Sequence, residues 1–364
     1  MKVIRVNLDR KICASHQIHV GDDILERMGL ILARADWASR YFVVTDSNVG
    51  PIYAEEVLAV LREANLAADL LEFPAREGSK GLETCLRLVE TMTTHGADRT
   101  SALLALGGGV VGDVTGFVAS VYMRGIPYIQ VPTTLLAQVD SGIGGKTGID
   151  LPQGKNLLGT FLQPKAVFID LRFLQTLSDR DFANGLAEVV KYGLIDDPEL
   201  FAMVEAQAEA IMRRDLALLE ELVSKSCTIK KSIVELDETE RGLRRILNFG
   251  HTIGHAIEAE SGYTISHGEA VSMGMVAEAV LSEKTRHLSR QERQRIECLL
   301  RSCGLPQRIP ASLSTDRIIS RIGVDKKRRG GVVPFVLLKK IGFPFVNGNI
   351  QEELLRETIE ELKE

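Results

Sequence analysis

The first half of the chain alternates short apolar runs with stretches of helical periodicity. The four clearest runs lie at residues 41–46, 101–106, 128–132 and 166–170, and each ends at, or is followed by, Asp, Gly or Thr. Runs without a polar side are typical of parallel strands that helices cover on both faces. The pattern therefore predicts a parallel α/β sheet with ligands bound where its strands end.

From about residue 178 the pattern changes to long helical periodicities. These run through residues 182–193, 216–234, 269–284 and 290–303. A length of 364 residues also suits two domains, each with its own core. We expect residues 1–177 to form an α/β Rossmann-like nucleotide-binding domain and residues 178–364 an all-α domain, with the active site between them.

Composition and charge exclude several classes of protein. The chain has 44 Lys and Arg against 49 Asp and Glu, and it lacks basic runs with interleaved aromatic residues, so a nucleic-acid partner is not expected. The basic run at residues 326–329 is the exception, and it reads either as a solvated loop or as an anion clamp. The five cysteines form no CxxC pair, which favours free thiols in a reducing cytosol.

The N-terminal residues 1–6 show an alternating strand pattern instead of a signal peptide. No run of eighteen apolar residues occurs, so neither secretion nor membrane spanning is expected. We expect a cytoplasmic protein.

A first glycine cluster is typical of phosphate binding. Gly107, Gly109 and Gly112 satisfy G-x-G-x-x-G between an expected strand and an expected helix, where backbone N–H groups can reach a pyrophosphate. No acidic residue about twenty positions on is placed to hold a ribose, so a tight turn without ligand stays open. Asp46 and Asn48, together with the polar loop from Glu77 to Lys80, are the candidates for the adenosine end.

A second glycine cluster, at residues 138–148, superficially resembles a P-loop. Asp140 stands where a P-loop requires glycine, so an NTPase is not indicated. Lys146, Lys155, Asn156 and Arg124 could nevertheless converge on a phosphate, although solvated surface lysines are the alternative.

Three of the seven histidines are concentrated in residues 251–267. His251 and His255 stand four apart, so on a helix both could reach one ion or one substrate, and His267 follows from the next element. Solvated or core histidines are the alternative. A catalytic zinc usually takes three protein ligands. Glu188 is the best carboxylate.

Glu188, Lys191 and Tyr192 stand at i, i+3 and i+4, on the polar side of an expected helix. A surface Glu–Lys pair is the alternative to a place in the metal site.

Seven ordered motifs resemble the 3-dehydroquinate synthase family, and the resemblance covers roughly residues 40–345. The motifs are residues 107–113, 132–141, 144–148, 154–156, 187–193, 247–252 and 267–269. Members of this family are two-domain enzymes of aromatic biosynthesis that depend on NAD and a divalent metal, and they are usually homodimers. They convert 3-deoxy-D-arabino-heptulosonate 7-phosphate into 3-dehydroquinate and phosphate.

The resemblance implies a role for each matching residue. It assigns the metal, zinc or cobalt, to Glu188, His251 and His267. It assigns NAD to Asp46, Asn48, Ala75, Arg76, Glu77, Gly78, Ser79, Lys80, Gly108, Gly109, Val110, Val111, Gly112, Asp113, Thr133, Thr134, Lys146, Lys155, Phe173, Leu174, Gln175 and Thr176. It assigns the substrate phosphate to Lys146, Asn156, Arg124, His255 and one of Lys326 or Lys327, and the substrate carboxylate to Arg244 and Lys230. Asp140 and Lys191, with Glu188, complete the polar centre.

The implied reaction has no net redox change, because NAD takes a hydride from the C5 hydroxyl and returns it after phosphate has left. Ring opening and an aldol closure then form the carbocycle. His255 is implied to relay a proton or to bind phosphate, not metal. Two residues depart from the family pattern: Gly142, which loosens the turn that presents Lys146, and Ser178, where proline is usual.

Three other functions stay open. Another sugar phosphate cyclase, of the inosose or valiolone type, is disfavoured because its substrate lacks the carboxylate that Arg244 and Lys230 would hold. A metal-dependent alcohol dehydrogenase would release NADH stoichiometrically. An inactive regulatory relative is disfavoured by the intact ligand set.

Overall fold

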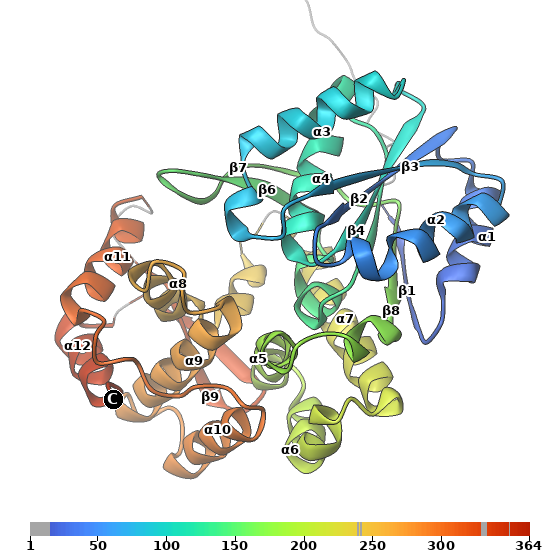
Figure 1. The fold of residues 1–364 in the computed structure, drawn as a ribbon. Helices are drawn as coiled ribbons and strands as arrows, with labels where there is room; N and C mark the ends of the chain where they lie inside the picture. The colour runs from blue at the N-terminus through green and yellow to red at the C-terminus, as the bar shows by residue number, and fades with distance from the viewer. Residues whose placement is uncertain (1–14, 239, 241, 329–332, 349) are drawn as a thin grey trace, which may run out of the picture.

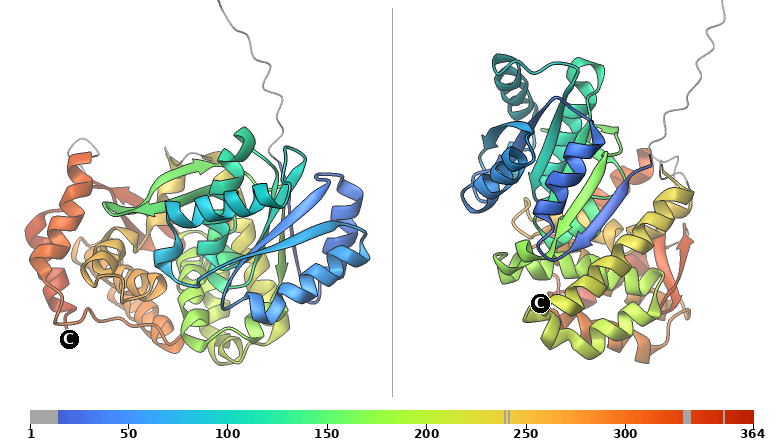
Figure 2. Two further views of the ribbon diagram at one scale, coloured as in Figure 1. Left: turned by 45° about the horizontal axis from the view of Figure 1, so that its top comes forward. Right: turned by 90° about the vertical axis from the view of Figure 1, so that its right-hand side faces the viewer.

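The computed structural model describes residues 15–364 except 239, 241, 329–332 and 349. The strand expected at residues 1–6 lies outside this part. The described chain forms a sheet covered by helices and, beside it, a mainly helical half (Figures 1 and 2). The expected α/β half and helical half are both confirmed.

One sheet of six parallel strands organises the first half, in the order β1-β8-β5-β4-β2-β3. The strands are β1 (Gln17–Gly21), β2 (Arg40–Asp46), β3 (Ala67–Phe73), β4 (Ser101–Gly107), β5 (Tyr128–Pro132) and β8 (Ala166–Asp170). Strands β2, β4, β5 and β8 are the four expected from the sequence. Every residue of β4, β5 and β8 is buried, which explains their unbroken apolar patterns.

Helices cover both faces of this sheet. Alternate residues of β2 enter different cores: Tyr41 and Val43 pack against α1 (Leu25–Ala35) and α2 (Glu55–Glu63). Phe42 and Val44 belong to the core formed with α3 (Leu82–Thr94) and α4 (Gly109–Val121).

The strand order reverses between β2 and β4. From β2 the chain continues outward to β3, whereas from β4 it continues to β5 and then β8 on the other side. Ligands of open parallel sheets bind at such a reversal, beyond the carboxyl ends of the strands. Asp46 ends β2, and Gly107 ends β4 next to it.

Eight helices surround a single core in the described part of the second half. They are α5 (Asp179–Ile195), α6 (Pro198–Met212), α7 (Leu216–Leu236), α8 (His251–Glu260), α9 (His267–Lys284), α10 (Arg290–Ser302), α11 (Thr315–Arg328) and α12 (Glu352–Glu361). They include the four helical stretches expected from the sequence. Helix α9 is buried along nearly its whole length. No helix among the described residues is long and apolar enough to cross a membrane.

The expectation of an all-α second half needs one correction. Strands β9 (Phe335–Lys340) and β10 (Phe343–Asn347) form an antiparallel hairpin whose first four residues are buried in the helical core. Gly342, with a φ of 83°, makes the tight connection that a sequence read only for helical periodicity does not reveal.

A second hairpin joins the two halves. Strands β6 (Lys146–Leu151) and β7 (Gly154–Phe161) pair antiparallel, leave the sheet half and reach over α8 (Figures 1 and 2). This hairpin carries Lys146, Lys155 and Asn156 to the border between the halves.

Candidate functional site

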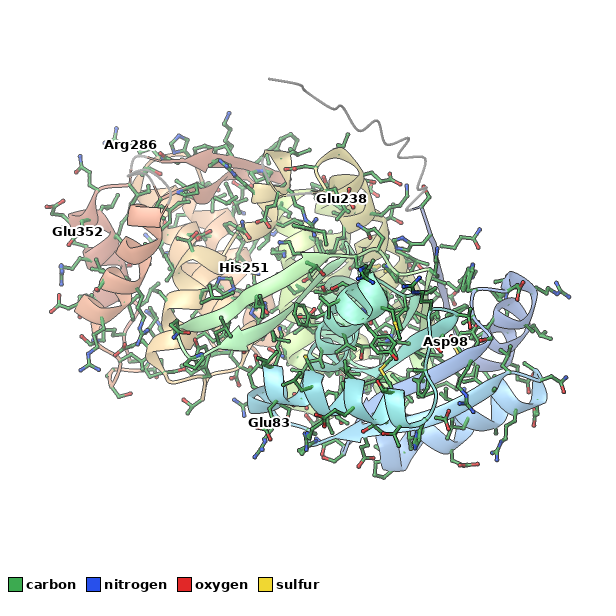
Figure 3. The ribbon with its side chains drawn as sticks, turned by 90° about the horizontal axis from the view of Figure 1, so that it is seen from above. Glu83, Asp98, Glu238, His251, Arg286 and Glu352 are labelled. Atoms are coloured by element: carbon green, nitrogen blue, oxygen red, sulfur yellow. The ribbon has the colours of Figure 1, made fainter. Side chains whose placement is uncertain are left out.

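Three helices bring together the predicted metal ligands. Glu188 lies in the middle of α5, whereas His251 and His267 are the first residues of α8 and α9. The Nε2 atoms of both histidines lie 3.3 Å from Glu188 Oε1, and one donor atom from each residue lies within 4.8 Å of the others. Figure 3 shows His251 near the middle of the molecule, at the border between the halves.

Close packing of α8 on α9 fixes where these imidazoles lie. A Cβ on Gly254 would stand 2.8 Å from the carbonyl oxygen of Ala270, so only glycine allows this approach. Gly250, just before α8, has a φ of 78° and donates its N–H to Glu278 Oε2 at 2.7 Å. Contacts of Gly250 and Gly254 with α9 therefore fix the start of α8 at His251.

The groups around the imidazoles suit a bound metal. His251 Nδ1 lies 3.0 Å from the carbonyl oxygen of Phe249; as Nδ1–H it would donate there and leave the Nε2 lone pair free toward Glu188. His267 Nδ1 lies 3.8 Å from Glu258 Oε2, the carboxylate–histidine arrangement common around protein-bound zinc. Two nitrogens and one carboxylate oxygen match a zinc or cobalt site.

The three histidines differ in the direction in which their surroundings shift their pKa values. Burial opposes protonation of His267, but its contacts with Glu188 and Glu258 raise its pKa to about 9. Burial lowers the pKa of His251. Desolvation, together with the charges of His251 and His267, lowers the pKa of His255 to about 3. A metal would therefore compete with a proton mainly at His267.

His255 lies beside the cluster without contacting Glu188. Its ring centroid stands 5.2 Å from that of His251 and 5.8 Å from that of His267, and its side chain is more exposed than theirs. A second donor set, made of His255, Glu258 and His267, also fits within 4.8 Å. His267 belongs to both sets.

Glu188, Lys191 and Tyr192 of α5 are buried, which excludes a surface Glu–Lys pair. Glu188 is 0% and Lys191 2% exposed, and the two form an ion pair. Burial alone would raise the pKa of Glu188, but the charges of Lys191 and His251 hold it well below its usual value. The helix carries charge on a face that packs inside the protein.

Asp140 is the centre of a second buried group. Its Oδ1 accepts hydrogen bonds from Lys230 Nζ at 2.6 Å and from the Tyr192 hydroxyl at 2.6 Å. Burial opposes ionisation, but Lys230 lowers the pKa of Asp140. Burial lowers the pKa of Lys230, while Asp140 raises it and the nearby charge of Arg244 lowers it further.

Arg244 is buried, and part of its guanidinium has no partner among the described residues. It lies in the 3₁₀ segment Leu243–Asn248, is 2% exposed and donates from Nη1 to the carbonyl oxygen of Glu238 at 2.6 Å. Its Nε is buried without a hydrogen-bond partner among the described residues. A Cβ on Gly144 would lie 2.6 Å from Nη2, so glycine is required opposite the guanidinium.

Two carboxylates of this region were missed by reading the sequence. Glu240 pairs with Lys146 and accepts a hydrogen bond from Asn248 Nδ2 at 2.8 Å, and Glu258 contacts both Lys155 and His267. Glu240 follows a polar stretch without a motif. Glu258 had a usable signal, because it stands three residues after His255 on the same helix face.

Apart from Lys146 and Lys155 on the hairpin, the predicted NAD residues gather at or after the carboxyl ends of β2, β3, β4, β5 and β8. Lys80 Nζ lies 2.6 Å from Asp113 Oδ2, which joins the loop after β3 to helix α4. The Thr133 N–H donates to the Gly107 carbonyl at 3.0 Å. Asp46 Oδ1 accepts the N–H groups of Asn48 and Val49 at 2.9 and 3.0 Å.

This edge of the sheet fits a dinucleotide. The N-terminus of α4 follows Gly108 and offers free N–H groups, and a Cβ at Gly109 would stand 3.0 Å from Ser141 Oγ. Thr133 Oγ1 and Ser141 Oγ are buried without a hydrogen-bond partner among the described residues. A polar ligand at the glycine turn would supply one.

Five of the residues predicted to contact NAD are buried or have other partners within the described chain. The side chains of Phe173 and Leu174 are 1% and 0% exposed and belong to hydrophobic cores, so only their backbone could face a ligand. Lys146 pairs with Glu240 and not with a residue of the NAD edge. Thr176 hydrogen-bonds Tyr53 at 2.6 Å, and Gln175 donates to the Arg214 carbonyl at 3.2 Å.

Arg124 lies at the end of α4 that is far from the glycine turn. It follows the C-terminal end of α4, about 20 Å from the glycine turn at 1.5 Å per residue. Arg124 is exposed and makes no hydrogen bond or ion pair with the described residues. Asn156 lies in β7, where its N–H donates to Asp150 Oδ1 at 2.8 Å. The side chains of Lys326 and Lys327 lie outside the described part.

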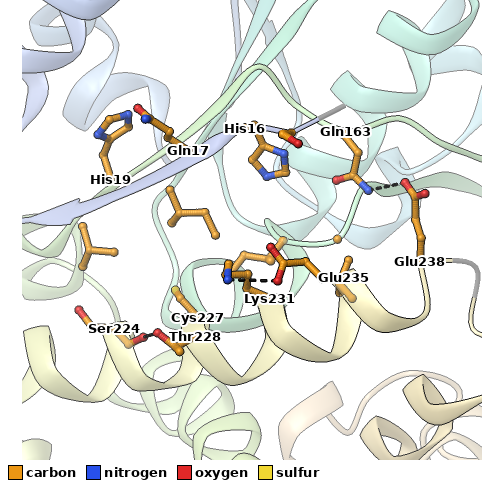
Figure 4. Close-up of a pocket in the computed structure, with 16 residues that line it drawn as sticks. His16, Gln17, His19, Gln163, Ser224, Cys227, Thr228, Lys231, Glu235 and Glu238 are labelled. Carbon is orange, nitrogen blue, oxygen red and sulfur yellow. Dashed lines mark hydrogen bonds and ion pairs between the residues drawn. The ribbon is translucent and has the colours of Figure 1, made fainter. Parts of the chain in front are cut away.

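Two cavities lie near these groups. One of about 410 Å³ is lined by Glu77, Lys80, Asp150, Lys155 and Tyr263, so it opens between the NAD loop, the β6–β7 hairpin and the helical half. A larger one, of about 870 Å³, lies between β1 and α7 (Figure 4). None of the predicted site residues lines the larger cavity.

Known proteins of one family are similar to this chain over nearly its whole length. Family models for the N-terminal and C-terminal parts of 3-dehydroquinate synthase match residues 70–184 and 185–328. The 3-dehydroquinate synthase of Desulforamulus reducens is 45% identical over 94% of this chain and 95% of its own. That of Nitrosospira multiformis is 42% identical over 99% of each chain.

Solved structures of related enzymes have the same fold. A 2-epi-5-epi-valiolone synthase from Streptomyces hygroscopicus subsp. jinggangensis, with NAD+ and Zn2+ bound, has a TM-score of 0.91 at 29% identity over 99% of each chain. A 2-deoxy-scyllo-inosose synthase, complexed with carbaglucose-6-phosphate, NAD+ and Co2+, has a TM-score of 0.85 at 29% identity over 94% of this chain and 96% of its own. An iron-containing alcohol dehydrogenase shares the fold at 17% identity.

Proposed function

The chain belongs to the 3-dehydroquinate synthase family, and from this membership we propose how its residues divide the work of the reaction. It is a carbon–oxygen lyase that converts 3-deoxy-D-arabino-heptulosonate 7-phosphate into 3-dehydroquinate and phosphate, with NAD and a divalent metal as cofactors. The relatives that share 42–45% identity over nearly full length carry this conclusion. The cyclases with other products share 28–29%.

Glu188, His251 and His267 would hold the metal. Their donor atoms already converge, and Phe249 and Glu258 orient the two imidazoles from behind. When bound, the metal would polarise the C5 hydroxyl and favour loss of its proton, while NAD would accept a hydride from C5 and later return it. Zinc and cobalt both suit this donor set.

Asp140, Lys191 and Lys230 would bind and orient the substrate hydroxyls. They form ion pairs in which both lysines are buried and Asp140 is 24% exposed, so water screens their charges only partly. Arg244, with its buried and unpartnered Nε, would bind the substrate carboxylate, and Lys230 beside it would add a second positive charge.

The phosphate end would be bound by cations from several elements. Lys146 and Asn156 come from the β6–β7 hairpin, and one of Lys326 or Lys327 comes from α11. His255 lies beside the two metal-binding histidines and would relay a proton or bind the leaving phosphate. These groups stabilise the charge that develops when phosphate leaves.

NAD would bind across the carboxyl ends of β2, β3, β4, β5 and β8. The glycine turn before α4 would approach the pyrophosphate, and Asp46 with Asn48 would face the adenosine end. The chain would divide at residues 177 and 178, because α5 begins the helical half at Asp179, although the family models divide at 184 and 185.

The enzyme would work as a cytoplasmic homodimer of the shikimate pathway, which leads to chorismate and the aromatic amino acids. Arg124 would then reach the phosphate site of the partner subunit, because it is exposed at the far end of α4. Exposed apolar side chains flank it at Val121 and Met123, 51% and 43% exposed, and would be covered by that contact.

Subunit complementation tests the role of Arg124. Arg124→Ala should lower kcat/KM about 10–100-fold through the loss of a charge-assisted contact. Mixing unfolded Arg124→Ala and His267→Ala chains and refolding them together should restore activity, because the mixed dimer contains one intact site. Activity that stays at the level of the separate variants would place Arg124 in its own subunit.

The overall function is tested by incubating the protein with the heptulosonate phosphate, catalytic NAD and zinc. Equal amounts of phosphate and 3-dehydroquinate should form without accumulation of NADH. Stoichiometric NADH would instead indicate a dehydrogenase. Turnover of sugar phosphates that lack the carboxylate, without turnover of the heptulosonate phosphate, would indicate another cyclase.

A further inference from the structure

We propose that Glu258 is a positioning residue that couples the two cofactor sites, by linking the metal-binding imidazole of His267 to Lys155 of the β6–β7 hairpin. The inference rests on the proposed metal site. Glu258 belongs to none of the motifs discussed above, yet it contacts both halves of the molecule.

Glu258 is built into the site by its position on α8. It stands seven residues after His251 and three after His255, which puts all three on one face of the helix. Its side chain is 7% exposed. Oε1 accepts from Lys155 Nζ at 2.8 Å, and Oε2 lies 3.8 Å from His267 Nδ1, so each oxygen faces a different partner.

Lys155 carries this contact to the sheet half. Its Nζ also lies 2.9 Å from Oε1 of Glu77, which belongs to the predicted NAD loop, and 4.4 Å from the ring centroid of Tyr263. Glu77 comes from the sheet half, whereas Glu258 and Tyr263 come from the helical half. The lysine, which lines the smaller cavity together with Glu77 and Tyr263, therefore connects carboxylates of the two halves.

A carboxylate behind an imidazole acts on the metal through the ring. It fixes which nitrogen carries the proton and makes the other nitrogen a better donor. Lys155 of the hairpin binds the same carboxylate. A shift of the hairpin on NAD binding would therefore move Glu258 and change its contact with His267. Such coupling is reciprocal: metal should strengthen NAD binding by the same factor by which NAD strengthens metal binding.

A direct role of Glu258 as a metal ligand is the competing explanation, since His255, Glu258 and His267 also form a donor set. Two contacts favour the positioning role. Glu258 faces Nδ1 of His267, whereas Glu188 lies near Nε2, and one oxygen of Glu258 is already occupied by Lys155.

Glu258→Gln tests this role, with Glu260→Gln as the matched control. Glu260 is on the same helix and is 6% exposed, but it pairs with Arg317 and Arg321 of α11. Zinc affinity is measured on folded metal-free protein by competition with a chromophoric chelator, and NAD affinity by titration with and without zinc. We expect Glu258→Gln to weaken zinc binding about 10–100-fold and to abolish the effect of zinc on NAD affinity, with Glu260→Gln like wild type.

The outcomes separate the explanations. Unchanged zinc affinity of Glu258→Gln, or an unchanged effect of zinc on NAD affinity, would overturn the positioning role alone. Complete loss of zinc from a protein with wild-type circular dichroism would make Glu258 a ligand. A wild-type protein that binds no zinc would overturn the proposed metal site, and this inference with it.

Discussion

The two halves of the molecule hold their polar site residues in different ways. In the sheet half, these residues follow the ends of parallel strands, and buried oxygens such as Thr133 Oγ1 have no partner among the described residues. In the helical half, three helices bring Glu188, His251 and His267 together, and buried charges such as Glu188 and Lys191 are paired within the protein. In the sheet half, backbone geometry positions the site residues. In the helical half, pairing of opposite charges allows the site residues to be buried. Apart from the contact between Glu258 and Lys155, variants in one half should therefore affect mainly the ligand of that half.

The largest effect is expected at the metal cluster. His267→Ala removes a ligand and the partner of Glu258, so we expect loss of stoichiometric zinc and a fall in activity of about a thousandfold or more, whereas His255→Ala should keep its zinc. Elemental analysis of the purified variants measures this. Equal metal content in the two variants would overturn the assignment of the ligands.

Breaking the buried pair of Asp140 and Lys230 tests charge compensation directly. Lys230→Met leaves a carboxylate without its main partner, so the free energy of unfolding should fall by about 3 kcal/mol. Urea denaturation measures it. Lys231→Met, next along α7, breaks an exposed pair with Glu235 and should cost less than about 0.5 kcal/mol. Similar losses in both variants would argue against a special role of burial.

A variant in the sheet half should show the opposite specificity. Gly109→Ala places a methyl group about 3.0 Å from Ser141 Oγ at the start of α4, which should weaken NAD binding about tenfold and leave zinc affinity unchanged. Titration with NAD and with zinc separates the two. A parallel loss of zinc affinity would mean that the halves are not independent at this position.

The smallest effect concerns the start of α9, which carries His267. Arg180 binds Glu269 at 2.9 and 2.8 Å, and this contact lowers the pKa of Glu269 to about 2, below its usual 4.5. The ionised carboxylate thus stabilises the fold above about pH 4.5, and this contribution is lost as the pH falls toward 2. Because Arg180 is exposed, Glu269→Gln should cost only about 0.5–1 kcal/mol at pH 7.

The pH dependence of that difference is the deciding measurement. The stability of wild type and Glu269→Gln should converge as the pH is lowered from 5 to about 2, since the carboxylate is then protonated. A difference that does not change with pH would mean that the charge of Glu269 is not the cause.

The sheet half was the easier part to predict. Its strands are short apolar runs, and its glycine turn lies between a strand and a helix that are adjacent in sequence, so residues 101–121 could be interpreted without distant contacts. The hairpin from Phe335 to Asn347 was not predicted, because its burial depends on α9, which is far away in the chain. Glu240 and Glu258 were missed for the same reason: their partners are 94 and 103 residues away.

The sequence by itself determined the order of strands and helices and the residue types of the site, because periodicity and glycine conformations are short-range properties of the chain. Only the tertiary structure decided which histidines share Glu188, since the packing of α9 against both α5 and α8 brings His267 to Glu188 across 79 residues. It also decided that Lys155 reaches Glu258 and that Arg124 stands at the far end of α4. Because each helical residue adds a fixed rise, residues at the two ends of one helix lie far apart even when both are assigned to one site. Side-chain packing, in contrast, brings together residues that are distant in sequence and belong to no common motif.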